Sequence, residues 1–327
     1  SVMLFETIAT KSLYFLVVYI FSKISFKEKI KLKDDFSLTG NMVMDKKGQI
    51  ELIDIKDIKG PKTSASAKIE IVNSPKKKVK VNVSGHSYDL NTLFDKREKA
   101  KKLSDKNKED DNLKDVVDAE IFIAVNSLWT NQDTPIKNFA GSAVFKNGIG
   151  IDEVHMVGNY GTDKSIKLKL DYVPRPEGEH LLSIDSNNAG STLRVLRLYE
   201  NMSGGILKIE GKHSADKGFI GHAQIRNFSI KNTPLLAKLL TVASFKGMLD
   251  LLMGEGITFS HFDAPFEYVD KTLKIKDAKM FGNVIGFTAS GKYNTSSEQL
   301  NLKGIISPAH SINAFIGKIP LPVKTEV

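Results

Sequence analysis

The stretch Ile166-Lys167-Leu168-Lys169-Leu170-Asp171-Tyr172 shows the pattern that decides the fold. Apolar and charged side chains alternate with a period of two residues, which is the period of a β-strand with one dry and one wet face. The same alternation recurs at residues 68–72, 79–83, 121–125, 206–209, 219–225, 273–275, 284–289 and 300–306. Turn-forming residues, and no helix-length segments, separate most of these stretches, so we predict a mainly β protein with an elongated, meandering antiparallel sheet.

The composition is that of a folded protein. The chain has 327 residues, of which 41% are apolar and 26% are charged, and both fractions are close to globular averages. It contains no cysteine, which excludes disulfides, thiolate zinc sites and thiol nucleophiles but leaves the compartment open.

The chain is basic, with 47 Lys+Arg against 38 Asp+Glu and a net charge of +9. Only five of the basic residues are arginines, the residue type that binds phosphate bidentately and stacks on bases. Because the lysines alternate with apolar residues and no basic run is interleaved with aromatics, nucleic-acid binding is not expected. The charge predicts wet strand faces with a general attraction to anionic surfaces such as lipid headgroups.

Three segments organise the chain. Residues 1–94 are predicted to be an N-terminal β segment, residues 95–118 a charged linker or exposed helix, and residues 119–327 a second β region. An unbroken apolar run at residues 13–21 is too short to span a bilayer. A buried strand is favoured for this run, and a membrane-inserting or targeting remnant is the alternative.

A helical segment is predicted near residues 234–253, where leucines recur at helical spacing after Pro234 and Gly254 follows the end. Gly247 is predicted to split it. It is either a core helix or an apolar helix that closes a lipid groove or lies at a bilayer surface.

Motifs that resemble catalytic or metal sites are incomplete. Residues 286–292 have the spacing of a phosphate-binding loop, but Tyr293 stands where the magnesium ligand is required. Residues 185–190 resemble the start of a calcium loop, but Leu196 occupies the closing position, so we predict a turn. The seven histidines are not spaced for joint metal binding. We therefore expect no enzyme activity and no metal or cofactor.

One block of sequence resembles a known family. It includes Ser203-Gly204-Gly205-Ile206-Leu207, Phe281-Gly282-Asn283 and Ser307-Pro308-Ala309-His310, within residues 203–313. This block is similar to the C-terminal region of the AsmA-like envelope proteins of Gram-negative bacteria, in their alphaproteobacterial form; YhdP and TamB are relatives. Weaker similarity extends upstream through Val83-Ser84-Gly85.

The resemblance implies a periplasmic protein, associated with the inner membrane, whose sheet curls lengthwise into a taco-like apolar groove. It further implies bridge-like transport of phospholipid or another acyl lipid, or outer-membrane lipid homeostasis. The alternative is a structural or assembly factor for outer-membrane components, acting through exposed sheet edges without lipid transfer. The chain lacks a clear N-terminal anchor and stops where relatives continue, which leaves open that it is a fragment.

The candidate residues for the lipid groove or its closure are apolar side chains of the helical segment and of the strand after it. They are Leu235, Leu236, Leu239, Leu240, Met248, Leu249, Leu252, Ile257 and Phe259.

Overall fold

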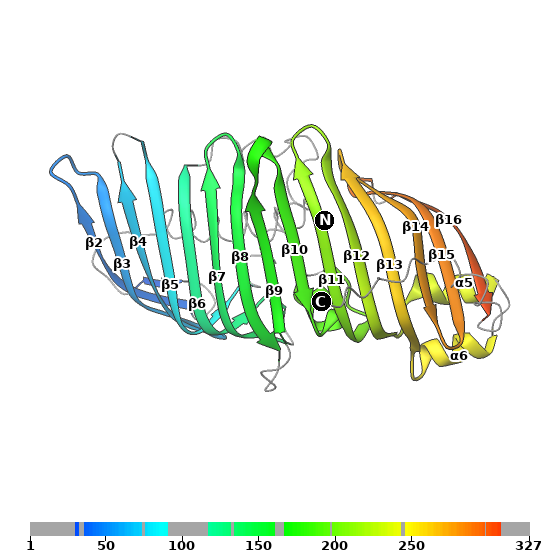
Figure 1. Ribbon diagram of the computed structural model, residues 1–327. Helices are drawn as coiled ribbons and strands as arrows, with labels where there is room; N and C mark the ends of the chain where they lie inside the picture. Colours follow the sequence, from blue (N-terminus) through cyan, green and yellow to red (C-terminus); the bar gives the residue numbers. More distant parts are fainter. Residues whose placement is uncertain are drawn as a thin grey trace, which may run out of the picture.

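The computed structural model is mainly β, as the alternation predicts, and its strands form one sheet (Figure 1). It describes residues 30–32, 36–73, 76–90, 117–131, 134–160, 167–196, 198–242, 246–297 and 299–308. The apolar run at 13–21 lies outside the described residues. The strands are β1 (Ile30–Leu32), β2 (Phe36–Met44), β3 (Ile50–Gly60), β4 (Thr63–Val72), β5 (Lys78–Asp89), β6 (Asp118–Trp129), β7 (Ile136–Lys146), β8 (Gly150–Tyr160), β9 (Lys167–Pro174), β10 (His180–Ser186), β11 (Met202–Ser214), β12 (Gly218–Ile230), β13 (Ile257–Val269), β14 (Thr272–Gly282), β15 (Ile285–Asn294) and β16 (Gln299–Pro308).

The strands follow one another in sequence order across the sheet, from β1 to β16. All neighbouring pairs are antiparallel except β5 and β6, which run parallel with Val81 opposite Ile121. The prediction of a purely antiparallel meander is wrong at this junction. A parallel pair needs a long connection, and the charged stretch between these strands is long enough to supply it. That stretch lies outside the described residues except at its end, where Asp118 already begins β6.

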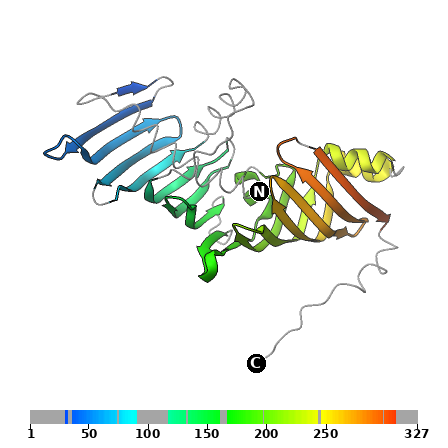
Figure 2. The same ribbon diagram turned by 90° about the horizontal axis from the view of Figure 1, so that it is seen from above.

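The sheet is open and bent. Several strands, β5 and β13 among them, curve along their length (Figure 1), and Figure 2 shows the same sheet from above. Among the described strands, β1 and β16 are the two edges and do not pair with each other. The sheet is neither closed nor strongly curled, so the predicted lengthwise curl into a taco-like groove is not a feature of the described strands.

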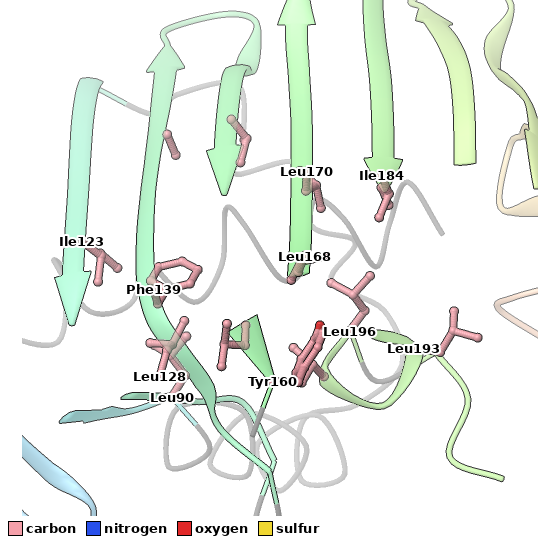
Figure 3. Close-up of a cluster of buried hydrophobic side chains, with 14 of the residues drawn as sticks. Leu90, Ile123, Leu128, Phe139, Tyr160, Leu168, Leu170, Ile184, Leu193 and Leu196 are labelled. Carbon is pink, nitrogen blue, oxygen red and sulfur yellow. The ribbon is translucent and has the colours of Figure 1, made fainter. Parts of the chain in front are cut away.

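One face of the sheet carries the core. In β9, Leu168 and Leu170 are almost completely buried while Lys167 and Lys169 are exposed, as the period of two predicts. Figure 3 shows both leucines beside Ile184 of β10. The buried side chains form one hydrophobic cluster that extends from β3 to β15.

The opposite face is polar and holds most of the charge. Cross-strand and same-strand ion pairs recur along it, such as Lys169 with Asp171 at 2.8 Å and Lys208 with Glu210 at 2.8 Å. The lysine excess therefore lies largely where the alternation places it, on wet strand faces.

Four short helical elements join the described strands: η3 (Pro176–Gly178), α4 (Ala189–Val195), α5 (Pro234–Val242) and α6 (Lys246–Met253). The predicted helical segment near 234–253 is confirmed in its limits, because α5 begins at Pro234 and α6 ends at Met253. The break lies between Val242 and Lys246, so Gly247 is inside α6 and does not split the helix. A single glycine costs a helix only about 1 kcal/mol, which packing can offset.

Helix α4 was not predicted. The turn expected at residues 185–190 is shorter than predicted, because β10 ends at Ser186 and α4 begins at Ala189. The side chain of Asn188 caps the helix and accepts a hydrogen bond from the Ser191 backbone N–H at 3.0 Å. Helix α4 packs against β11, and its Leu193 and the following Leu196 extend the core (Figure 3).

Candidate functional site

The apolar face of the sheet changes character along its length. In β3 to β10 its side chains are nearly all buried, and Ile69, Ile121 and Leu170 expose 1% of their surface or less. In β14 to β16 the same face is partly open, and Leu300 and Leu302 of β16 are 47% and 38% exposed. A monomeric protein rarely leaves a large contiguous apolar patch in water, so this open part is the candidate site.

The strand register extends this open part into one surface, which we call the C-terminal apolar face; two of its members, Tyr268 and Ala278, are buried. Its members point to one side of β13 to β16 and form rows that cross the strands. They are Phe262, Phe266, Tyr268, Leu273, Ile275, Ala278, Met280, Phe287, Ala289, Gly291, Tyr293, Leu300, Leu302, Gly304 and Ile306.

The relief of the C-terminal apolar face follows from the sizes of these residues. One row has large side chains, with Met280 opposite Phe287 and Phe287 opposite Ile306. The neighbouring row has small ones, with Ala278 opposite Ala289 and Ala289 opposite Gly304. Because adjacent rows on one face are about 7 Å apart, the small row forms a low strip beside the large one, running along the length of the sheet.

Aromatic contacts fix the base of the C-terminal apolar face. The rings of Phe228 and Phe259 stack with centroids 5.5 Å apart, and Phe259 contacts Phe287 at 6.0 Å. Phe219 and Phe266 stack at 5.6 Å. Such pairs stabilise beyond their buried area, so the buried rings hold the partly buried rings of Phe266 and Phe287 in place.

The described residues among those predicted for the groove lie beside this face, at the start of β13 and in α5 and α6, and most of them are buried. Ile257 and Phe259 begin β13 and expose 2% and 0% of their surface. Leu236 and Leu240 of α5 and Leu252 of α6 are buried as well, and Leu249 is half-buried. The side chains of Leu235, Leu239 and Met248 lie outside those that the structure describes. The described members are therefore mainly packing residues, whereas the open surface belongs to residues that sequence reasoning did not name.

A polar cluster interrupts the dry face at the strand ends of β8 to β11. Tyr172 and His180 stack at 4.8 Å, and the Tyr172 hydroxyl lies 2.9 Å from Nδ1 of His213. Asp152 is buried, lies 3.5 Å from Nε2 of His180 and pairs with Lys146 at 2.6 Å. Burial, and secondarily the neighbouring His180, lowers the pKa of His213.

A second polar cluster lies on the wet face of β12 and β13. Asp263 accepts hydrogen bonds from His222 at 2.9 Å and from Gln224 at 3.0 Å. Partial burial alone would raise the pKa of Asp263, but the two hydrogen bonds outweigh it and lower the pKa. Across the described residues, no group of three or more acidic or histidine side chains is arranged to hold a metal ion.

The stretch that resembles a phosphate-binding loop, residues 286–292, lies inside strand β15. Its backbone N–H groups belong to a strand and do not converge as a loop before a helix would. In the part of the chain that the structure describes, no helix is both long and apolar enough to cross a bilayer.

Comparison with known proteins does not assign this chain to a family: no family model, no curated protein and no solved structure matches it. The resemblance to AsmA-like proteins therefore stays a prediction.

Proposed function

We propose that this chain is a non-enzymatic cell-envelope protein of the AsmA-like type that carries phospholipid or another acyl lipid on its C-terminal apolar face. The observation that supports it is the partial exposure of a contiguous apolar surface in β14 to β16. Covering that surface with acyl chains would gain about 25 cal/mol for each Å² removed from water.

The shape and chemistry of the face suit an acyl chain. A hydrocarbon tail needs no hydrogen bonds, and the face offers aliphatic and aromatic side chains with few polar groups. The accessible strip at Ala289 and Gly304 runs across the strands, so a tail lying in it would point along the length of the sheet. The lipid would thus rest on an open, gently bent surface and not in a closed trough.

The proposed lipid site does not extend over the closed half of the sheet. Side chains such as Ile69 and Leu170 are already buried, so the same face in β3 to β10 has no room for a tail as it stands. Lipid passage along the whole sheet would need that half to open. Binding on the C-terminal apolar face needs no such change, and an envelope location with inner-membrane association is part of the same proposal.

Adjacent residues in β16 provide the test. Ile306 belongs to the C-terminal apolar face and lies opposite Phe287, whereas Ile305 lies opposite Thr288 on the wet face and is 57% exposed. Uptake of a fluorescent phospholipid from vesicles by the delipidated protein should be lost in Ile306→Glu and retained in Ile305→Glu. Equal uptake by both variants, or no uptake by the wild type, would contradict the proposal.

A second candidate function is an assembly factor that pairs with a partner strand. Strand β16 supports it, because it pairs with β15 over ten residues without a register shift and forms an edge of the described sheet. A long, regular edge is a template for strand addition. A stable protein partner that is lost in Leu302→Pro, together with no lipid co-purifying, would favour this function over lipid carriage.

A further inference from the structure

A pocket of about 430 Å³ lies at the strand ends of β13 to β16, on the wet face. Its lining residues alternate with Leu273, Tyr293 and Leu300, so it is on the opposite side of the sheet from the C-terminal apolar face. The lining residues are Val269, Asp270, Thr272, Lys274, Lys292, Asn294, Gln299 and Asn301.

Two lysines of this pocket face each other across neighbouring strands. Lys274 and Lys292 are direct cross-strand partners, an arrangement that like charges make unfavourable. The acid opposite Lys274 on β13 is Glu267. Its carboxylate pairs with Lys276 at 2.5 Å and interacts with Lys274 only as a more distant charge. Neither Lys274 nor Lys292 has an ion-pair partner among the described residues.

Neutral hydrogen-bond donors surround the two lysines. The Asn294 side-chain oxygen accepts from the backbone N–H groups of Ser296 and Ser297 at 3.0 and 2.9 Å, which leaves its NH₂ group free to donate. Asn301 lies opposite Lys292, and Gln299 lies opposite Asn294. Charged and neutral donors therefore converge on one small volume.

We propose that this pocket binds a phosphate group, carried by a small soluble molecule or by a lipid headgroup. Two ammonium groups and three amides match the several acceptor oxygens of a phosphate, and a bound anion would relieve the repulsion between the lysines. Asp270 is the one carboxylate in the lining and opposes the anion. The pocket lies on the polar face, so this inference does not depend on lipid carriage by the other face.

The test is calorimetric titration of the full chain with glycerol 3-phosphate. The double variant Lys274→Gln with Lys292→Gln should bind about tenfold or more weakly, because charge-assisted hydrogen bonds are lost. Asp270→Asn should bind more tightly. Lys303→Gln is the matched control, since Lys303 lies on the same face of β16 outside the pocket lining, and its affinity should stay unchanged.

The thermal transition of each variant checks that it folds. Sedimentation with phosphatidylglycerol vesicles identifies the source of the phosphate. A parallel loss of vesicle binding in the double variant assigns a headgroup, and a loss confined to glycerol 3-phosphate assigns a soluble ligand. Equal weakening by Lys303→Gln, or unchanged affinity in the double variant, would overturn the site whether or not Ile306→Glu abolishes lipid uptake.

Discussion

The two ends of the sheet share the same alternation of apolar and polar residues but differ in how far their apolar side chains are buried. Leu170 in β9 is completely buried, whereas Met280 in β14, on the same dry side, is only half-buried. Ala143 in β7 is 4% exposed, and Ala289 in β15 is partly open. A period of two residues thus determines which side of a strand is dry, but not whether anything covers it.

The side chains differ between the ends in a way that fits this contrast. The closed half is filled with branched aliphatic residues such as Ile69, Val81 and Ile121, which pack densely and have few rotamers. The open end carries Phe262, Met280 and other aromatic or flexible residues that adapt to a surface placed on them. The closed half should therefore set stability, and the open end should set binding.

The largest expected effect comes from truncating one side chain in each half. Leu170→Ala should lower the free energy of unfolding by about 2–5 kcal/mol, because it leaves a cavity in a closed core. Met280→Ala should cost less than half as much, since water already reaches that side chain. Urea unfolding followed by circular dichroism measures both, and Trp129, the one tryptophan of the chain, reports on the closed half by fluorescence. Equal losses of unfolding free energy in the two variants would contradict the difference in packing between the two halves.

The next effect comes from enlarging one alanine in each half. Ala143→Leu should destabilise the protein by about 1–3 kcal/mol, because it overfills a packed site. Ala289→Leu should change stability by less than about 1 kcal/mol, because its new methyl groups enter open space. It should instead reduce phospholipid uptake severalfold by filling the low strip. An Ala289→Leu variant with full uptake would show that the strip holds no tail.

A smaller effect concerns His213 of the dry-face polar cluster. Its folded-state pKa is lowered by burial and then by His180, so the unfolded chain binds the proton more readily. Stability from this group is present above the unfolded pKa, about 6.5, and is lost progressively below it, as pH falls through the lowered folded-state pKa. His213→Gln should therefore lose less stability than the wild type between about pH 7 and pH 5 in thermal melts. An identical pH slope would contradict the lowered pKa.

The smallest effect, with the opposite sign, is expected at His155 on the wet face. Hydrogen bonds to Asp171 and then Glu153 raise its pKa above the ordinary value. Its stabilising contribution is complete below about pH 6.5 and is lost as pH rises through the raised folded-state pKa. Because nearly half of the His155 side chain is in water, solvent screens most of this gain. Melting curves of His155→Gln should gain on the wild type as pH rises; a parallel pH dependence would contradict the raised pKa.

The sequence predicts the local part of this architecture well. The dry and wet residues of 167–172 lie on opposite faces as the alternation indicates, and Pro234 marks the start of a helix as its fixed backbone angle suggests. Helix α4 could have been predicted from the sequence, because Asn188, a favourable N-cap residue, precedes a short segment with apolar residues at helical spacing.

Other features had no local signal. Whether β5 meets β6 in parallel depends on a connection whose path the alternation does not encode. The rows of the C-terminal apolar face depend on register, which shifts between Phe259 and His261 and again between Asp263 and Phe266. The pairing of Lys274 with Lys292 likewise emerges only once β14 and β15 are aligned. Coverage of a strand face is a tertiary property, so the open end of the sheet could not be located from period alone.

Native mass spectrometry of the delipidated chain after incubation with phospholipid shows whether the C-terminal apolar face binds acyl lipid. We expect phospholipid adducts on the wild type and on Ile305→Glu, and none on Ile306→Glu. A wild-type spectrum without adducts, or adducts of equal abundance on all three proteins, would contradict lipid binding at this face.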